Sequence, residues 1–367
     1  MSKPTLRDVT AATHLPALDG LRAVAIGGVM VFHYGLLPFG FAKLGVSLFF
    51  VLSGFLITLL MLREHEATGT VSLKRFYARR ALRIFPAYYV FLAVAFGWMA
   101  FHGDAVPGAL VLVSVFYVLN YAQASGSFRQ TPVSHCWSLA IEEQFYLLWP
   151  FMLRTAWRRQ MPVRALIAGV IVAICIWRTI LAAADVGRGY YYFAFDTRFD
   201  TLLIGCALAV CARDEWTQRA ARVVSFGPLA PLVTLGLLVL AQIMPYDLFR
   251  LTLGNSVEAL LLAVLLVQGL MLHQHALWRW LNWPVVRYLG TISYPLYLYH
   301  QLSGPIVDSL GQPRWAVHLM LQVVLAVALA VTSYHVVEQP FLRLKLRLAA
   351  RTSRPMAPVL SEAAAEA

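Results

Sequence analysis

The sequence predicts an all-α protein whose chain crosses a membrane several times. Its residues are 60% hydrophobic and 13% charged, and its mean hydropathy is +0.67. A soluble domain of 367 residues does not have this composition, whereas a multi-pass membrane protein does. Apolar runs near the length of about 20 residues that crosses a bilayer recur along the chain. Basic residues concentrate in some of the linkers between these runs.

Ten apolar segments are predicted as transmembrane helices. They lie near 16–34, 45–62, 85–102, 137–153, 165–184, 199–212, 224–242, 251–272, 289–308 and 315–337. Two of them, 137–153 and 199–212, are short, so we expect their true ends to extend further. The apolar stretch 108–122 is also short, and counting it as a span would move the arginines of 154–164 to the outer side. We therefore interpret it as a re-entrant or peripheral helix on the outer side.

The basic linkers predict the orientation of the chain. With ten spans, the arginine-rich linkers 63–84, 154–164 and 213–222 and the segment after 337 all fall on one side of the membrane. The positive-inside rule then places both termini in the cytoplasm. We expect residues 1–345 to form a single membrane domain and residues 346–367 to form a disordered cytoplasmic tail.

The first predicted span carries three ionisable residues, Asp19, Arg22 and His33. Such groups are costly at membrane depth and usually serve a function there. At about 100° per residue all three lie on one helical face, and His33 lies about 16 Å further along the axis than Arg22. This geometry predicts a polar path through the bundle, with these residues as candidate catalytic groups. The alternative for His33 is an interior histidine whose hydrogen bonds are satisfied.

The segment 76–89 places Arg79, Arg80 and Arg83 just before the predicted span 85–102. Arg80 and Arg83 are three residues apart and share a helical face, so two guanidinium groups can hold one polyanion. This pattern predicts a phosphate or pyrophosphate site for a cofactor that arrives from the cytoplasm. The alternative is that these arginines only set the topology and contact anionic lipid.

Two adjacent carboxylates, Glu142 and Glu143, follow the start of the span 137–153. By depth, one of them is expected near the level of His33. A carboxylate beside a histidine orients its tautomer and stabilises the imidazolium, which supports a general base. Glu142 is therefore a further candidate catalytic residue.

The segment 290–301 contains Ser293, Tyr297 and His300 at helical spacing, so these side chains are expected to line one cavity. Ser293 and Tyr297 are candidates for contacting the cofactor. In the segment 195–200 we favour an internal ion pair between Asp200 and an arginine over a chemical role.

Other glycines, serines and histidines are interpreted as structural residues. Gly45, Ser53 and Gly54 in the segment 45–57 permit close contact between helices, and we favour that packing role. The histidines of 273–275 have no neighbouring carboxylate or thiolate, so no metal site is expected there. No phosphate-binding loop of the ATPase type is present, which argues against ATP-driven transport by this chain.

Seven motifs, taken together and in order, resemble the acyltransferase family 3 membrane proteins. These are LDGLRAVAIGGVMVFH, GVSLFFVLSGFLIT, RRALRIFPAYY, WSLAIEEQFYLLWP, RFDTLLIGCALA, ISYPLYLYH and VVEQPF. The resemblance covers residues 15 to about 345. Members are mainly bacterial enzymes that O-acylate, most often O-acetylate, surface polysaccharides, lipid-linked sugars and some macrolides.

The resemblance implies a ten-helix core in a bacterial inner (plasma) membrane that uses acyl-CoA from the cytoplasm, with acetyl as the default group. The R-x-x-R pair of the family matches Arg80 and Arg83, which would hold the phosphates of CoA. The arginine and histidine of its first helix match Arg22 and His33, and His33 would be the catalytic base. Its W-S-L-x-x-E glutamate matches Glu142. Some members carry an extracytoplasmic esterase-like domain, which we expect this chain to lack.

The resulting hypothesis is a membrane O-acyltransferase that moves an acyl group from acyl-CoA to a hydroxyl of a carbohydrate, a lipid-linked glycan or a macrolide. The alternative is a transporter or flippase for lipid-linked sugars without thioester chemistry, which would use the same polar path. Membrane lipid is an expected partner, nucleic acid is not, and no metal is expected.

Overall fold

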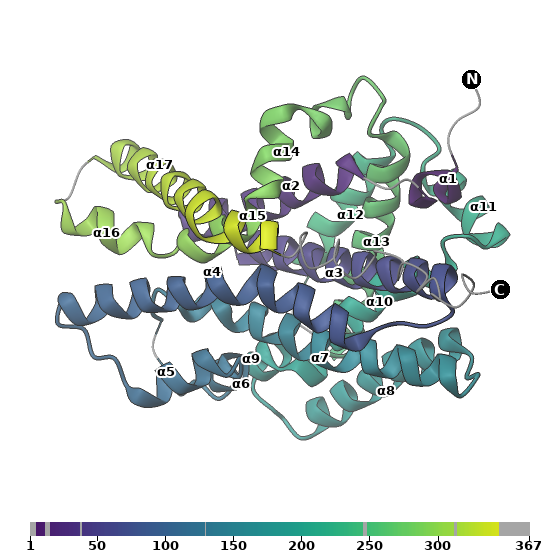
Figure 1. Ribbon diagram of the computed structural model, residues 1–367, viewed down its shortest axis with the longest axis horizontal. Coiled ribbons are helices and arrows are strands. Elements are labelled where there is room, and N and C mark those ends of the chain that lie inside the picture. The colour runs from purple at the N-terminus through teal and green to yellow at the C-terminus, as the bar shows by residue number, and fades with distance from the viewer. Residues whose placement is uncertain are drawn as a thin grey trace, which may run out of the picture.

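The computed structural model describes residues 5–11, 15–36, 39–128, 130–244, 248–311 and 314–344. Every regular element in these ranges is a helix, and no strand occurs in them, as the all-α prediction requires. The helices form a bundle that is longest in the horizontal direction of Figure 1. The predicted tail 346–367 lies outside the described residues.

Within the described residues, nine long helices make up most of the bundle. They are α2 (Pro16–His33), α3 (Phe39–Thr68), α4 (Leu73–Phe101), α7 (Trp137–Arg158), α8 (Val163–Ala183), α10 (Phe199–Cys211), α12 (Ala230–Ile243), α13 (Asn255–Leu272) and α17 (Trp315–Ser333). Shorter α-helices connect them: α1 (Leu6–Ala11), α5 (Gly108–Val115), α6 (Leu119–Ala124), α9 (Arg188–Phe193), α11 (Glu215–Val224), α14 (Pro284–Thr291), α15 (Ser293–Tyr299) and α16 (Ser303–Ser309). A π-helical turn, η3 (Arg250–Gly254), precedes α13, and another, η5 (Tyr334–Glu338), follows α17.

Five helices of the described chain are long and apolar enough to cross a membrane. They are Lys43–Thr68, Leu73–Phe101, Val163–Ala183, Arg250–Leu272 and Trp315–Leu344. The other predicted spans fall on helices that are shorter or more polar. Two of these, Phe199–Cys211 and Ala230–Ile243, are apolar throughout. The chain is therefore built as a membrane protein.

The predicted span 289–308 is not one helix. It consists of the end of α14, then α15 and then most of α16, with breaks at Ile292 and after Tyr299. Pro295 and Pro305 explain both breaks, because a proline has no N–H to donate and its ring clashes with the carbonyl four residues earlier. The broken helix places His300 in a turn between two helical segments.

The stretch 108–122 also forms two short helices, α5 and α6, in place of one. Tyr117 between them has a φ of 55°, in the left-handed region, which ends the first helix. The eight residues of α5 extend about 12 Å, far less than the roughly 30 Å of apolar bilayer core. This agrees with the prediction of a short helix that does not cross by itself.

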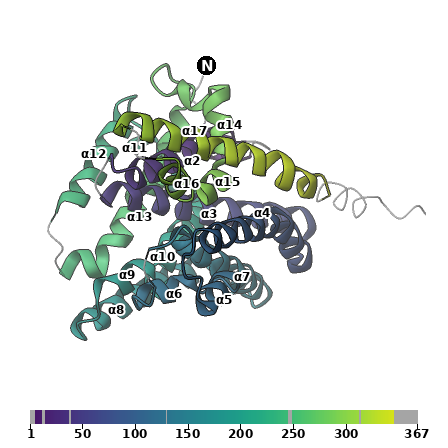
Figure 2. The same ribbon diagram turned by 90° about the vertical axis from the view of Figure 1, so that its left-hand side faces the viewer.

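Helix α3 is the centre of the bundle. In the most apolar part of Lys43–Thr68, 72% of the residues are buried, against 22% for α8 and 17% for α17 with its extension. Helices α8 and α17 lie on opposite sides of the molecule in both views (Figures 1 and 2). Their exposed side chains include Val172, Ile176, Met320 and Val324, a surface suited to lipid.

Glycines bring α3 into backbone contact with its neighbours. A Cβ atom added to Gly45 would meet the Ala25 carbonyl of α2, and one added to Gly54 would meet the Leu202 carbonyl of α10. Gly205 of α10 faces α3 in the same way, against the Val51 carbonyl. The predicted packing role is therefore confirmed for Gly45 and Gly54, whereas Ser53 faces a cavity and donates a hydrogen bond to Glu142 of α7.

Buried ion pairs join neighbouring helices, one between α8 and α10 and one between α3 and α13. Asp200 of α10 binds Arg178 of α8 at 2.9 Å, and neither side chain is exposed. Lys43 of α3 binds Glu258 of α13 at 2.9 Å. The predicted internal pair of Asp200 with an arginine is confirmed, and its partner comes from α8. Arg198 instead binds Ser47 and Asn255.

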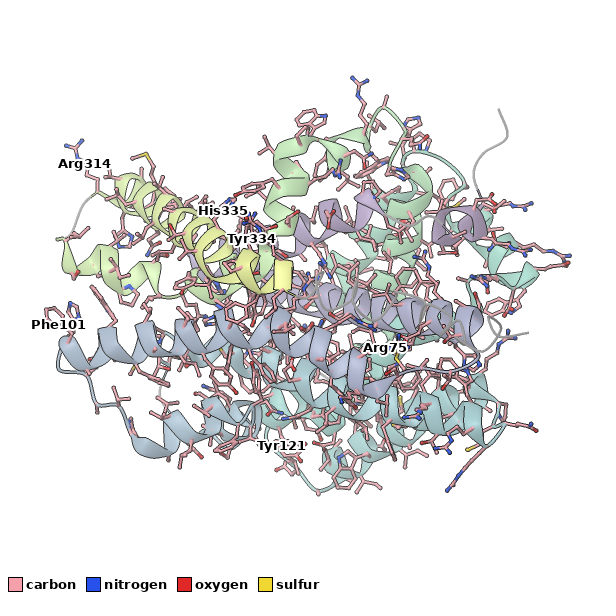
Figure 3. The ribbon with its side chains drawn as sticks, viewed as in Figure 1. Arg75, Phe101, Tyr121, Arg314, Tyr334 and His335 are labelled. Atoms are coloured by element: carbon pink, nitrogen blue, oxygen red, sulfur yellow. The ribbon has the colours of Figure 1, made fainter. Side chains whose placement is uncertain are left out.

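Basic linkers lie together at one end of the molecule. Arg213, which follows α10, binds Glu66 near the end of α3 at 2.6 Å. Arg164 at the start of α8 binds Asp214 at 2.7 Å. Three linkers predicted to share one side of the membrane are thus in contact. Phe101, at the other end of α4 from Arg75, lies at the far left of Figure 3.

We predict that Gly54→Ala lowers the midpoint of thermal unfolding in detergent. The added methyl group meets a backbone carbonyl that cannot move aside, and such overpacking costs about 1–3 kcal/mol or more. Gly236→Ala on α12 is the control, because no atom lies within 4 Å of its added Cβ. Equal midpoints for the two variants would contradict the role of Gly54.

We also predict that Asp200→Asn destabilises the protein by about 3–5 kcal/mol, because it leaves the Arg178 charge buried without its partner. The matched control is Glu215→Gln, which removes the exposed pair with Arg219 and is expected to leave the unfolding midpoint unchanged. Denaturation of both variants in mixed micelles checks this. A stable Asp200→Asn protein would show that Arg178 finds another partner.

Candidate functional site

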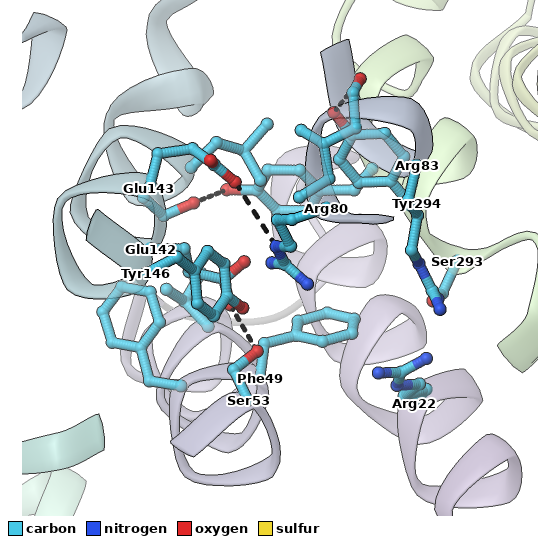
Figure 4. Close-up of a pocket in the computed structure, with 16 residues that line it drawn as sticks. Arg22, Phe49, Ser53, Arg80, Arg83, Glu142, Glu143, Tyr146, Ser293 and Tyr294 are labelled. Carbon is cyan, nitrogen blue, oxygen red and sulfur yellow. Dashed lines mark hydrogen bonds and ion pairs between the residues drawn. The ribbon is translucent and has the colours of Figure 1, made fainter. Parts of the chain in front are cut away.

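A cavity opens in the middle of the bundle between α2, α3, α4, α7 and α15. We call it the arginine cavity. Its polar lining residues are Arg22, Ser53, Arg80, Arg83, Ser138, Glu142, Glu143, Ser293, Tyr146, Tyr294 and Tyr297. Figure 4 shows this cavity, with the three arginines converging on it from α2 and α4. The structure therefore brings together most of the site residues predicted from separate motifs.

Arg80 is held in place within the arginine cavity. Its guanidinium carbon lies 3.3 Å from the ring centroid of Tyr146, a cation–π contact. Its Nε atom lies 3.7 Å from a carboxylate oxygen of Glu143. Glu142 accepts a hydrogen bond of 2.8 Å from Ser53 of α3 (Figure 4). Two carboxylates thus balance part of the positive charge.

Arg22 and Arg83 have no such close partners, and the carboxylate that attracts Arg83 from a distance is Glu338. Among the described residues, neither guanidinium group forms a hydrogen bond or an ion pair, and their side chains point toward each other beside Ser293 (Figure 4). Two neighbouring cations repel, and desolvated charge without a partner is costly. An arrangement of this kind stabilises a bound anion, and guanidinium groups suit phosphate oxygens particularly well.

Two further cavities continue from the arginine cavity. Arg79 lines one of them together with Arg80, and its guanidinium binds Glu64 at 3.2 Å. Asp19 lines the other together with Arg22 and Arg83, and Glu338 also lines this cavity. Asp19 is thereby separated from His33, although both lie on the same helix.

A second central cavity lies further along α2, and we call it the histidine cavity. The polar residues that line it are His33, Gln123, Gln130, Ser134, His135, Tyr192, Tyr297 and Gln301, and its aromatic residues include Trp137. Among its described lining residues there is no Asp, Glu, Lys or Arg. The two cavities therefore differ in charge.

His33 is oriented by two acceptors. Its Nδ1 atom lies 2.9 Å from the Val29 carbonyl oxygen and 3.2 Å from Nε2 of His300. A carbonyl only accepts hydrogen bonds, so Nδ1 carries the hydrogen. In the neutral ring, Nε2 is then the nitrogen with the lone pair, the form that a general base requires.

The expected partnership of Glu142 with His33 is wrong. Glu142 lines the arginine cavity and binds Ser53, whereas His33 lines the histidine cavity and contacts His300. Depth along the membrane predicted them at one level. In the structure, however, Glu142 lies five residues further along α7 than Trp137, the α7 residue that lines the histidine cavity, and so it reaches only the arginine cavity.

Tyr297 lies in the wall between the two cavities. It and Val46 are the described residues that line both. The Tyr297 hydroxyl donates to the His135 carbonyl oxygen at 2.9 Å and lies 2.6 Å from the Ser138 hydroxyl. The cavities thus meet at a polar contact. Ser293, the other candidate from the same helix, lines only the arginine cavity of these two.

Sequence reasoning missed His135 and Gln301. Nδ1 of His135 lies 3.2 Å from the Gln301 side-chain oxygen, and its ring packs 4.8 Å from that of His300. His135 precedes an apolar span by two residues, and a histidine in that position was a usable signal. The sequence contained no comparable signal for Gln301, because its place in the cavity depends on the helix break near Pro305.

Metal chemistry has no evident location in the described ranges. No group of three or more His, Cys, Asp or Glu side chains gathers there at metal-binding distance. What the arrangement offers is a cationic cavity suited to a polyanion, an uncharged cavity with a histidine whose Nε2 can accept a proton, and one wall shared by both.

Comparison with known proteins gives consistent matches across the chain. Residues 15–335 match the acyltransferase domain of acyltransferase family 3. The chain is 31% identical to "Peptidoglycan O-acetyltransferase OatA" of Listeria monocytogenes over 355 residues, covering 89% of this chain and 56% of the relative. It is 32% identical to "Putative peptidoglycan O-acetyltransferase YrhL" of Bacillus subtilis over 364 residues, covering 89% and 55%.

The chain is also similar to "Putative O-acetyltransferase SACOL0978" of Staphylococcus aureus, at 30% identity over 349 residues, with 89% of this chain and 57% of the relative covered. The chain spans about half the length of these curated relatives. No solved structure matches it. The family match covers most of the chain and includes every helix that lines the two cavities, so this protein belongs to acyltransferase family 3.

Proposed function

We propose that this chain is a membrane O-acyltransferase that transfers an acetyl group from acetyl-CoA to a hydroxyl of a carbohydrate acceptor. The observation that carries the proposal is the meeting of two cavities of different charge at Tyr297. A polyanionic donor suits the first cavity, and a neutral acceptor suits the second. Family membership and the printed names of the relatives support acyl transfer as the reaction.

The donor is assigned to the arginine cavity by its charge. Arg80 and Arg83 would bind the phosphates of CoA, with Arg22 as a third cation and Arg79 at the neighbouring entrance. Ser293 and Tyr297 would contact the pantetheine arm. A CoA phosphate gives Arg22 and Arg83 the direct hydrogen-bonding partner that neither guanidinium group has among the described residues.

The acceptor is assigned to the histidine cavity by its chemistry. Amide side chains such as Gln123 and Gln301 donate and accept hydrogen bonds as hydroxyl groups require, and Trp137 and Tyr192 offer flat apolar faces. Sugar rings present both hydroxyl groups and apolar C–H faces. The relatives are named for peptidoglycan, and we propose a related glycan, free or lipid-linked, ahead of a macrolide.

The chemistry follows from the position of His33. Its Nε2 takes the proton of the acceptor hydroxyl as the oxygen attacks the thioester carbon, and a new C–O bond forms. The C–S bond then breaks, and the CoA sulfur receives the proton from His33. An acetyl ester and free CoA are the products. General-base catalysis of this type contributes about 10²–10⁴-fold.

The topology that this requires is ten membrane crossings by residues 1–345 in a bacterial inner membrane, with both termini in the cytoplasm. The contacts among the basic linkers support a single cytoplasmic end. The arginine cavity is continuous with residues near that end, such as Arg79 and Glu64. Acyl-CoA would therefore enter from the side where the cell supplies it.

A transporter for lipid-linked sugars is the less favoured alternative. It would use the polar path, but it has no need of a thioester or of the phosphate-binding arginines. Family membership favours transfer over transport.

The decisive experiment measures thiol release from acetyl-CoA by the purified protein in nanodiscs, with and without chitotetraose as a neutral oligosaccharide acceptor. We expect release that increases with the acceptor, together with acetylated product by mass spectrometry. No release under either condition, and no thermal stabilisation by CoA, would contradict the proposal.

We predict that His33→Gln lowers kcat by about 10²–10⁴-fold while the protein still binds CoA, because only the proton acceptor is lost. Thiol release and CoA-dependent thermal shift are measured on the same preparation. His102→Gln is the control, since His102 is an exposed residue at the far end of α4. Full turnover in His33→Gln would remove His33 from the mechanism.

We predict that Arg80→Ala with Arg83→Ala raises KM for acetyl-CoA by at least tenfold, because each charge-assisted hydrogen bond contributes about 1.5–3 kcal/mol. The matched control, Arg219→Ala with Arg222→Ala, removes two positive charges at the basic end of the molecule, outside the cavities assigned to the substrates. An equal change in KM in both double variants would indicate a general electrostatic effect.

A further inference from the structure

We propose that His300 is a positioning residue that fixes the tautomer of His33 and so makes it a base. The inference rests on the proposed function, since it assigns a part of the same site. Sequence reasoning gave this supporting role to a carboxylate, Glu142. The structure puts a second histidine in its place.

The hydrogen bonds of His300 determine its own tautomer. Its Nδ1 lies 2.6 Å from the Tyr297 carbonyl oxygen, which only accepts, so Nδ1 carries the hydrogen. In the neutral ring, Nε2 then has the lone pair, and it lies 3.2 Å from Nδ1 of His33. His300 therefore accepts a hydrogen bond from His33.

This acceptor strengthens one tautomer of His33. With the Val29 carbonyl, His300 provides two acceptors for the hydrogen on Nδ1. A histidine side chain free in water favours the hydrogen on Nε2 instead, and that form has no lone pair at Nε2 for the substrate proton. The two acceptors reverse this preference, and the lone pair then resides on Nε2.

The surroundings of His300 hold its ring still. The side chain is fully buried, and its ring packs 4.9 Å from that of His33 and 4.8 Å from that of His135. The carbonyl of His300 accepts a hydrogen bond from Ser303, which secures the turn after α15. Rigid supporting contacts of this kind keep a reactive side chain in its productive orientation.

A neutral hydrogen-bond acceptor suits the position of the His300 side chain better than a carboxylate. The described lining of the histidine cavity contains no charged residue, and an uncompensated carboxylate there would be costly to bury. The lone pair of His300 still faces Nδ1 of His33 when His33 takes a proton from the hydroxyl group of the carbohydrate substrate. It thereby stabilises the imidazolium without adding a fixed charge.

The kinetic test compares His300→Gln with His300→Leu, using acetyl-CoA and chitotetraose. The glutamine side-chain oxygen can accept the hydrogen bond from His33 in place of Nε2 of His300, whereas leucine offers no acceptor. We expect His300→Leu to lower kcat by about 10- to 100-fold with an unchanged KM for acetyl-CoA, and His300→Gln to recover most of the loss. His102→Leu is the control for losing a histidine. Equal kcat values in His300→Leu and the wild type would overturn the proposal.

A second measurement does not depend on activity. Nitrogen-15 NMR of histidine-labelled protein reports which ring nitrogen carries hydrogen, and the His33 signals are assigned by their loss in His33→Gln. We expect hydrogen on Nδ1 in the wild type and a shift toward Nε2 in His300→Leu. Hydrogen on Nε2 in the wild type overturns the proposal even if His300→Leu fails to fold. A wild type that lacks acetyl transfer but shows the expected tautomer contradicts only the proposed function.

Discussion

Close backbone contact of helix α3 with α2 and α10 is the constraint on which the rest of the structure depends. Gly45, Gly54 and Gly205 permit it, because any side chain at these positions would meet a neighbouring carbonyl. The contact places α2 against the most buried helix of the bundle, so the polar face of α2 turns toward protein and away from lipid. Both central cavities lie along that face.

The surroundings of α2 change from charged to uncharged along the length of the helix. Arg22 lies among other arginines near the basic end, and His33 lies eleven residues further on among uncharged groups. Arginines remain charged wherever they are, so they require carboxylates or a ligand for compensation. A histidine needs only hydrogen bonds to stay neutral, and an uncharged cavity favours that form. This separation allows one helix to contribute to two kinds of site.

The broken segment that contains α15 connects the two sites. Pro295 and Pro305 interrupt the helix, and the turn between them directs His300 toward His33. Tyr297, one helical turn earlier, supplies both the carbonyl that orients His300 and a hydroxyl in the wall between the cavities. One segment thus supports the histidine and separates it from the arginines. A straight helix would not place both groups in this way.

The sequence by itself determined the helical fold, the membrane environment, the family and the identity of most cavity residues. These depend on composition, periodicity and local spacing, which the chain carries in its own order. The partners of those residues were decided only by the tertiary structure: Ser53 for Glu142, Arg178 for Asp200 and His300 for His33. Depth can be counted along a helix, but rotation between helices depends on how their surfaces pack. That packing joins residues far apart in the chain, so local patterns do not contain it.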